Sequence, residues 1–148
     1  MKNRSADHTK MKKNIFFLFL LFWVADNISA QSINATMTWE CQYILSKDSS
    51  GAIAMEKMQG IGSIKFPGDS TLSIKTLCNT GNAKLKMKLD GSMKIIDIAM
   101  TFVWCDEASK EAAFVKGLRN TSAFEINETG LKLYTKDKKG YMFFVSKK

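Results

Sequence analysis

The sequence predicts a mainly β domain of the α+β kind, a small antiparallel curled sheet or β-barrel with one crossing α-helix. Apolar and polar residues alternate with a period of two over most of residues 38–146, as in strands with one buried face. Turn-forming residues separate these runs, and only residues 106–120 show helical spacing. A single sheet of this kind must cover its apolar face, either by curling or by packing a helix across it.

The first 30 residues have the features of a secretory signal peptide. A basic flank, Met11-Lys12-Lys13, precedes an unbroken apolar run at residues 15–25. A transmembrane helix needs about 20 apolar residues, whereas this run has the length of a signal-peptide core. We expect cleavage after Ala30, with Met1 or Met11 as the start and residues 1–10 as an N-terminal extension. The protein is therefore expected to be exported, periplasmic or secreted, with no stable membrane span after cleavage.

Export narrows the chemistry that the mature domain can perform. Cleavage removes His8, the one histidine, which excludes Ser–His or Cys–His catalysis and the usual histidine-containing zinc sites. The removed segment carries five basic and two acidic residues, so the formal net charge falls from +8 to +5. This charge is too small to indicate nucleic acid as a partner. We expect that the mature domain is not an enzyme and that it holds no cofactor and no metal ion.

Alternation predicts the individual strands. In the opening strand, Trp39, Cys41, Tyr43 and Leu45 share one face. Later positions that share a buried face are Ile64 with Phe66, Leu72 with Ile74, and Leu131 with Leu133. Pro67-Gly68-Asp69 is a predicted turn, and residues 141–145 form an apolar closing strand.

The clearest strand covers residues 84–89, where Lys84, Lys86 and Lys88 alternate with apolar residues. Asp90-Gly91 follows, a pair typical of hairpin turns because both positions tolerate positive φ. The returning strand carries Ile96, Ile98 and Met100. The lysine face is either a solvated surface that discourages edge-to-edge aggregation or a surface that attracts acidic lipid headgroups or polysaccharide.

One helix is predicted over residues 106–120. Ala108, Ala112, Val115 and Leu118 form a stripe at helical spacing, with Phe114 beside it. Asp106 or Ser109 can cap the start. Acidic residues near the start and basic residues near the end also suit the helix dipole.

Three cysteines follow the expected cleavage site: Cys41, Cys78 and Cys105. They show no C-x-x-C spacing, so an exported chain can form one disulfide and keep one thiol. Cys41 shares the Trp39 face, which favours buried packing over a reactive thiol.

The chain also resembles the META domain, or HslJ-like, family over residues 38–146. The resemblance rests on Cys78-Asn79, the run Thr101-Phe102-Val103-Trp104-Cys105, and the spacing Glu111-x-x-Phe114-x-x-x-Leu118. Trp39 in the opening strand, Leu131-Lys132-Leu133 and a closing glycine–aromatic strand complete it. The chain departs from the family pattern at Leu77, at residues 82–84, and at Trp104, which stands where a small residue is usual.

The resemblance implies a lipocalin-like topology, an envelope or secreted location, and a link to stress response. It brings no agreed enzymatic activity and no catalytic residues. It also implies that Cys78 and Cys105 form a disulfide, while free thiols and pairings with Cys41 stay open. Its other marked positions are Trp39, Asn79, Thr101, Glu111, Phe114 and Leu118.

Two of these positions have competing interpretations. Asn79 either caps a turn through local hydrogen bonds or contacts a ligand. Glu111 makes a dipole or capping contact, is a solvated surface charge, or acts as a functional acid with a second carboxylate. Methionine and aromatic side chains on inward faces either fill the core or line an apolar cavity.

These observations lead to one functional hypothesis and one alternative. We expect a monomeric, non-enzymatic accessory domain of the envelope that binds an apolar ligand such as an acyl chain, a lipid, or another envelope protein. The alternative is a purely structural, stress-protective secreted domain without a ligand.

Overall fold

A computed structural model of the chain describes residues 37–147. The expected signal peptide, its cleavage after Ala30, His8 and the choice between Met1 and Met11 lie outside the described residues. Nine strands and one helix follow one another as β1 (Thr38–Lys47), β2 (Ile53–Lys57), β3 (Gly62–Gly68), β4 (Thr71–Thr76), β5 (Thr80–Met87), β6 (Met93–Met100), α1 (Ala108–Arg119), β7 (Thr121–Asn127), β8 (Gly130–Thr135) and β9 (Gly140–Lys147). Within residues 37–147, no helix is long and apolar enough to cross a membrane.

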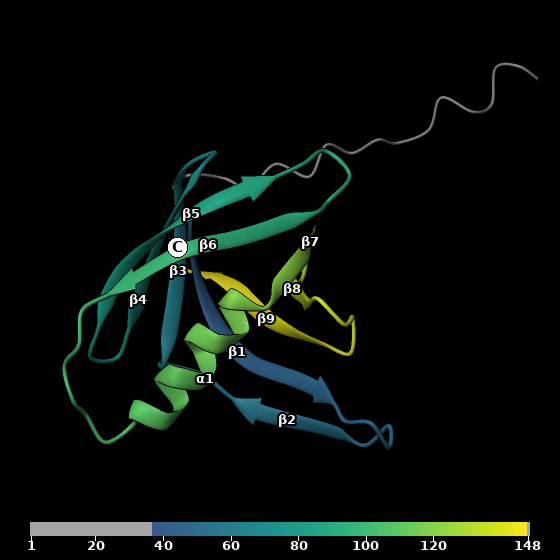
Figure 1. The fold of residues 1–148 in the computed structure, drawn as a ribbon, viewed down its shortest axis with the longest axis horizontal. Coiled ribbons are helices and arrows are strands. Elements are labelled where there is room, and N and C mark those ends of the chain that lie inside the picture. The colour runs from purple at the N-terminus through teal and green to yellow at the C-terminus, as the bar shows by residue number, and fades with distance from the viewer. Residues whose placement is uncertain (1–36, 148) are drawn as a thin grey trace, which may run out of the picture. The chain divides into compact units, whose positions relative to one another are not determined.

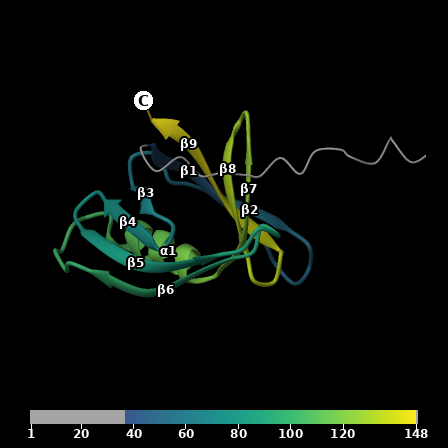
Figure 2. The same ribbon diagram turned by 90° about the horizontal axis from the view of Figure 1, so that it is seen from above.

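The strands form one antiparallel sheet in the order β6-β5-β4-β3-β1-β9-β8-β7, and β2 pairs with the second half of β1. The sheet curls until its two ends approach each other (Figures 1 and 2). At one point they touch: Ser92 and Ala123 form a β-bridge, and the Phe124 N–H donates to the Gly91 carbonyl at 2.9 Å. The predicted curled antiparallel sheet with one helix is therefore confirmed as a half-barrel.

Helix α1 lies in the sequence between the two ends of the sheet and packs into its concave side (Figure 2). Phe114 and Leu118 are fully buried in the core that the strands share. The Phe114 ring lies so close to β3 that a Cβ atom at Gly62 would stand 2.7 Å from it. The glycine therefore allows the helix to approach the sheet.

A β-bulge changes which side of β1 faces the core. Cys41 pairs with Phe144 on β9, but Tyr43 pairs with Phe143, so Gln42 is an extra residue on β1. Beyond the bulge the faces exchange, and the Tyr43 ring stacks on Phe143 outside the core with a centroid distance of 5.2 Å. The predicted single face of Trp39, Cys41, Tyr43 and Leu45 is therefore correct for Trp39 and Cys41 and wrong for the other two.

A second bulge has the same effect in β6. Lys84 pairs with Ile96 and Asn82 with Ala99, which leaves two residues of β6 opposite one residue of β5. Asp97 has φ +53°, a conformation that aspartate tolerates better than most residues. Ile98 and Met100, after the bulge, pack against the core, whereas Ile96 does not. The side chains buried before the bulge are Met93 and Ile95.

The helix begins two residues later than predicted, and its buried face agrees with the prediction at Phe114 and Leu118 but not at Ala112 and Glu111. Its first flanking residue is Glu107, which makes no side-chain cap, so neither Asp106 nor Ser109 caps the helix. The buried residues are Glu111, Phe114 and Leu118, whereas Ala112 from the predicted stripe is exposed. The burial of a glutamate on this face is explained by its hydrogen bonds, described below.

The lysine face is exposed, as predicted. Lys84 and Lys86 on β5, and Lys88 directly after it, are all exposed. Lys84 forms a surface ion pair with Asp97 at 2.9 Å. Such exposed pairs contribute about 0.2–1 kcal/mol, so this face adds little to stability.

Candidate functional site

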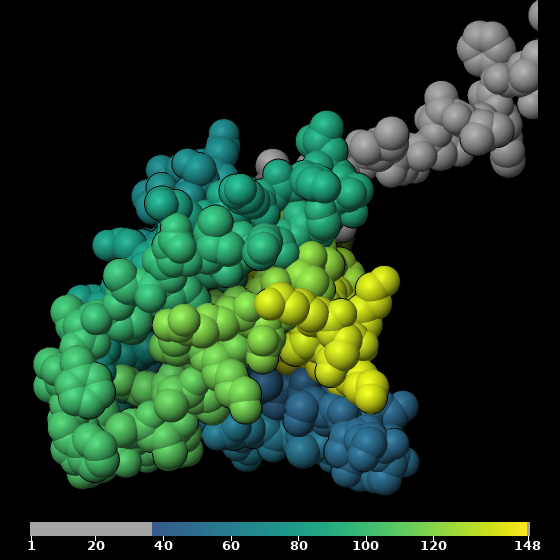
Figure 3. Space-filling model, in the orientation of Figure 1, coloured from purple at the N-terminus to yellow at the C-terminus, as the bar shows by residue number. Residues whose placement is uncertain are grey.

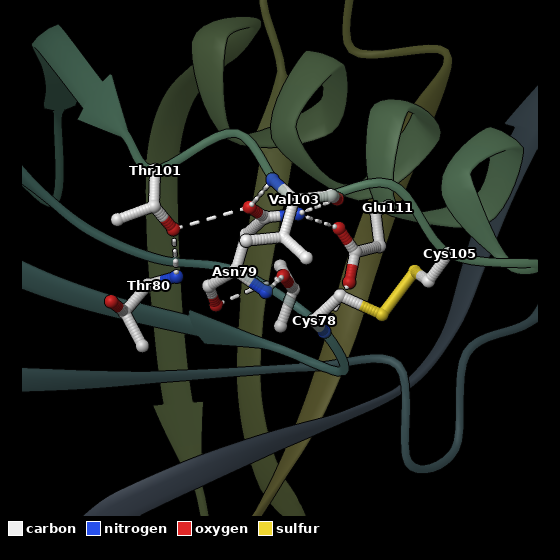
Figure 4. Close-up of a disulfide and its surroundings, with 8 residues drawn as sticks. Cys78, Asn79, Thr80, Thr101, Val103, Cys105 and Glu111 are labelled. Carbon is white, nitrogen blue, oxygen red and sulfur yellow. Dashed lines mark hydrogen bonds between the residues drawn. A yellow bond between two sulfur atoms is a disulfide. The ribbon is translucent and has the colours of Figure 1, made fainter.

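A disulfide joins the β4–β5 turn to the loop between β6 and α1. Cys78 and Cys105 are bonded, with a Cα–Cα distance of 6.4 Å and a sequence separation of 27 (Figure 4). This is the pairing that the family resemblance implied. Its presence is compatible with an oxidising, exported location.

Asn79 is the centre of a hydrogen-bond network beside the disulfide (Figure 4). Its Nδ2 donates to the Val103 carbonyl at 3.0 Å and to Glu111 Oε2 at 2.7 Å. Its Oδ1 accepts from the Val103 N–H at 2.7 Å and from the Thr101 hydroxyl at 3.1 Å. An amide side chain offers two donors and two acceptor positions, so Asn79 is fully used within the protein.

Local bonds hold Asn79 in this position. Its backbone N–H donates to Thr76 Oγ1 at 3.0 Å, and its carbonyl accepts from the Thr76 N–H at 2.8 Å. The interpretation of Asn79 as a turn residue is thus correct, but its side chain reaches further, to the β6–α1 loop and to α1. No position remains for the alternative, a ligand contact.

Glu111, in the first turn of α1, also belongs to this network. Its carboxylate is buried, with the residue 7 % exposed, and accepts from the Cys78 N–H and from Asn79 Nδ2, each at 2.7 Å. Burial alone would raise the pKa of Glu111, but hydrogen bonds from Asn79, Cys78 and Thr76 hold that pKa below its ordinary value. Glu111 is therefore ionised at neutral pH and is neither a solvated surface charge nor a helix cap.

Thr101 completes the network at the end of β6. Its hydroxyl accepts from the Thr80 N–H at 3.0 Å while donating to Asn79, and its own N–H donates to the Thr80 carbonyl at 2.8 Å. The β6–α1 loop is therefore fixed at Thr101, at Val103 and at Cys105.

The chemistry available to this cluster is limited. The ligand atoms of Cys78, Cys105 and Glu111 lie within 4.8 Å of one another, a spacing that suits a metal ion. However, the two sulfur atoms are bonded to each other and offer no thiolate. The Glu111 carboxylate already accepts strong hydrogen bonds and has a lowered pKa, which is unfavourable for a general acid.

The fixed loop exposes large apolar side chains next to the disulfide. Phe102, Val103 and Trp104 are 91 %, 56 % and 79 % exposed, and Leu77, the residue before Cys78, is 57 % exposed. We call these four residues the apolar patch. The loop that carries three of them lies at the edge of the domain (Figures 1 and 3). Contiguous exposed apolar residues of this kind mark interaction sites.

A basic hollow adjoins the apolar patch. It has a volume of about 990 Å³ and extends over the outer face of β3, β4, β5 and β6, with Leu77 and Thr101 in its wall. Its basic residues are Lys65, Lys75 and Lys147, and its acidic residue is Glu40, which lies 3.5 Å from the Lys147 ammonium. The surface beside the patch thus favours contact with negative charge.

The other marked residues belong to the core. Trp39, Phe114 and Leu118 are buried and do not contribute to the apolar patch. Cys41 is fully buried, and burial raises the pKa of its thiol to about 12, so it is an unreactive core residue.

Sequence reasoning missed most of the apolar patch. In the sequence, Phe102 and Val103 stand out only as part of a family motif, and Leu77 and Trp104 only as departures from the family pattern. The departures at Leu77 and Trp104 are the feature of the sequence that could have revealed the patch. A large apolar residue in place of a small one must be accommodated either in the core or at the surface.

Comparison with known proteins agrees with the fold. The sequence model of the META domain family matches residues 27–148. The structure is similar to the crystal structure of a DUF4847 family protein from Bacteroides vulgatus, with 18 % sequence identity and a TM-score of 0.61, covering 76 % of this chain and 94 % of that one. No curated protein matches the sequence.

Proposed function

The chain belongs to the META domain family, and from that premise we propose that it is a non-enzymatic, exported accessory domain that docks on an envelope protein through the apolar patch. The observation that carries this proposal is the exposure of Phe102 and Trp104 on a loop fixed by Asn79 and by the disulfide. A fixed loop loses little conformational entropy on binding, so its exposed aromatic side chains can contribute most of their contact energy.

The neighbouring charges indicate the chemistry of the partner. Aromatic residues are enriched at the centres of protein interfaces, where they fill pockets and dominate affinity. Lys65 and Lys75 line the basic hollow, whose wall also includes Leu77 of the apolar patch. A fitting partner therefore has an apolar pocket for Trp104 and an acidic rim that faces the two lysines.

Two positions of the apolar patch support a role specific to this chain. Leu77 and Trp104 depart from the family pattern, and both are exposed beside the disulfide. The marked family residues Asn79, Thr101 and Glu111, in contrast, hold the loop in place. A link to stress response stays a prediction from the family resemblance.

The alternative, a purely structural secreted domain, is favoured by the packed core and the disulfide but leaves the exposed aromatic residues without a role. A photo-crosslinking amino acid at position 102, in cells that export the protein, separates the two functions. Leu89, which is fully exposed in the β5–β6 turn, provides a matched control position outside the patch.

The proposal predicts one protein adduct from position 102 and none from position 89. Trp104→Ser should abolish the adduct, and Leu89→Ser should leave it unchanged. The captured protein should have an acidic surface around an apolar pocket. No adduct from position 102, or equal adducts from both positions, would show that the patch is not a docking site. Adducts to lipid alone would show that the patch contacts a membrane surface and not a protein partner.

A further inference from the structure

Strand β2 forms a free edge of the sheet, at the margin of the domain (Figures 1 and 3). Among the described residues it pairs with β1 alone, and all of its residues are exposed, including the large apolar side chains of Ile53 and Met55. The turn before β2 is held by Asp48, whose Oδ1 accepts from the Ser50 N–H at 2.8 Å and from the Ala52 N–H at 2.9 Å. The edge is therefore presented by an ordered hairpin.

Hydrogen bonds at the two ends of the β1–β2 ladder show which backbone groups of β2 face β1. The Asp48 N–H donates to the Ala52 carbonyl at 3.0 Å, and the Met58 N–H donates to the Gln42 carbonyl at 2.8 Å. Between these ends the register has no shift. Hydrogen-bonded and non-hydrogen-bonded pairs alternate along an antiparallel ladder. Every second residue of β2, beginning with Ala54, therefore bonds to β1.

The remaining residues of β2, which are Ile53, Met55 and Lys57, direct their N–H and C=O groups away from β1. Among the described residues, no further hydrogen bond reaches these groups. Edge strands of natural proteins commonly carry a proline, a bulge or charged residues that prevent pairing with another chain. In β2 the charged residues, Glu56 and Lys57, stand at one end, and the segment from Ile53 to Met55 has none of these devices. This segment can accept a further strand.

The strand that fits this edge is a second copy of β2 itself. Antiparallel pairing about a two-fold axis at Ala54 would place Ile53 opposite the partner's Met55, and the reverse. Apolar pairs directly across two strands are stabilising, and each of these pairs would also exchange two backbone hydrogen bonds. An axis at Met55 would instead set Ile53 against the partner's Lys57. An axis at Glu56 would set two carboxylates opposite each other, which is unfavourable.

We propose that β2 pairs with β2 of a second copy of this chain about a two-fold axis at Ala54, so that the two sheets join into one. Glu56 would then face the partner's Ala52, and Lys57 the partner's Gly51, so no like charges stand opposite each other. A two-fold axis closes the assembly at two copies. The contact is smaller than a standard interface, so the dimer forms at high protein concentration and dissociates on dilution.

Such a dimer departs from the monomer expected from the sequence. It uses β2, whereas the proposed docking function uses the β4–β5 turn and the β6–α1 loop. The two proposals therefore stand or fall separately.

A cysteine at position 54 tests both the contact and its register. In a non-hydrogen-bonded antiparallel pair the opposite Cα atoms lie about 4.5 Å apart, a distance that a disulfide can span. Cys41 is buried and Cys78 is bonded to Cys105, so neither competes with the introduced thiol. Under mild oxidation, Ala54→Cys should give a covalent dimer. Leu89→Cys, at an exposed position in the β5–β6 turn, should give several-fold less.

Hydrogen exchange followed by NMR tests the contact in the unmodified protein. The N–H groups of Ile53 and Met55 should exchange several-fold more slowly in concentrated than in dilute solution. The Ala54 N–H, which already bonds to β1, should change little. Met55→Pro removes an outward N–H without breaking a bond within the chain, and proline is tolerated at such edge positions. This variant should lose self-association in sedimentation equilibrium, whereas Met55→Val, which keeps the N–H, should retain it.

Several results would overturn the proposal. These are a monomer at all protein concentrations up to about 1 mM, equal crosslinking of Ala54→Cys and Leu89→Cys, or exchange at Ile53 and Met55 that is independent of concentration. Trp104→Ser disturbs the apolar patch and should leave the dimer intact; a dimer lost in this variant would show that the copies associate through the patch instead. Should Met55→Pro fail to fold, exchange in the unmodified protein still decides the question.

Discussion

Glu111→Gln gives the sharpest test of the network that fixes the β6–α1 loop. The substitution keeps the size of the side chain and replaces one carboxylate oxygen by an NH₂ group. In the structure both oxygens accept strong hydrogen bonds, from the Cys78 N–H and from Asn79 Nδ2. A glutamine can accept one of these bonds, but its NH₂ group then faces the other donor and leaves it unpaired.

The expected loss follows from this mismatch. A hydrogen bond to a charged group contributes about 1.5–3 kcal/mol, and an unpaired buried donor costs about 1–3 kcal/mol. We therefore expect Glu111→Gln to lower the free energy of unfolding by about 2–3 kcal/mol at neutral pH. For a domain of this size, this corresponds to a fall of roughly 8–13 °C in Tm.

A control for charge lies in the same region of the helix. Glu107 precedes α1, is partly exposed and pairs with Lys110 at 2.8 Å. Glu107→Gln removes one negative charge near the helix N-terminus, as Glu111→Gln does, so both variants lose a similar dipole interaction. Because Glu107 takes no part in the network, we expect its substitution to cost less than about 1 kcal/mol.

The difference between the unmodified protein and Glu111→Gln should also depend on pH. The network holds the pKa of Glu111 below its value in the unfolded chain. Its stabilising contribution is therefore complete above the unfolded pKa of about 4.3 and is lost as the pH falls through the folded pKa. Urea unfolding at pH 7 and at pH 3 measures this. The reasoning would be refuted if the unmodified protein and Glu111→Gln had equal unfolding midpoints at pH 7. It would also be refuted if their difference were the same at both pH values.

Two further predictions concern the core and the disulfide. Gly62→Ala should destabilise the domain by about 1–3 kcal/mol, because the new methyl group would stand 2.7 Å from the buried Phe114 ring. Gly68→Ala, where a Cβ meets nothing within 4 Å, should change stability little, and equal urea midpoints would contradict this account. Replacing Cys78 and Cys105 by alanine should cost about 3.5 kcal/mol, from the closed segment of 27 residues. Dithiothreitol should lower the unfolding midpoint of the unmodified protein to that of the double variant and leave the double variant unaffected. If the double variant loses less than about 1 kcal/mol in the free energy of unfolding, the result would argue against the disulfide.

The fold class could be predicted because the alternation of apolar residues survives in the regular strands. Leu72 and Ile74, and likewise Leu131 and Leu133, are buried as their spacing indicates. The prediction fails at Tyr43, since a bulge adds one residue and reverses every later side chain of β1. Bulges depend on the pairing partner, so a sequence pattern in a single strand cannot reveal them.

The candidate site was predictable to a smaller extent. The pairing of Cys78 with Cys105 came from the family resemblance, whereas the residues alone allowed other pairs. The burial of Glu111 could not be predicted, because a glutamate on a helix is normally solvated unless the chain brings donors to it. Those donors lie on a turn more than 30 residues away in the sequence, at Cys78 and Asn79.

The network and the apolar patch have different consequences for function. Asn79, Thr101 and Glu111 use their polar atoms within the protein, so they determine where the loop lies and not what it contacts. Phe102 and Trp104 contribute little to the packed core and are exposed instead. Exposed apolar side chains do not stabilise the domain that carries them, so stability alone does not explain their presence. It follows that changes at Phe102 and Trp104 should alter binding without altering the unfolding midpoint, and that changes at Glu111 should alter both.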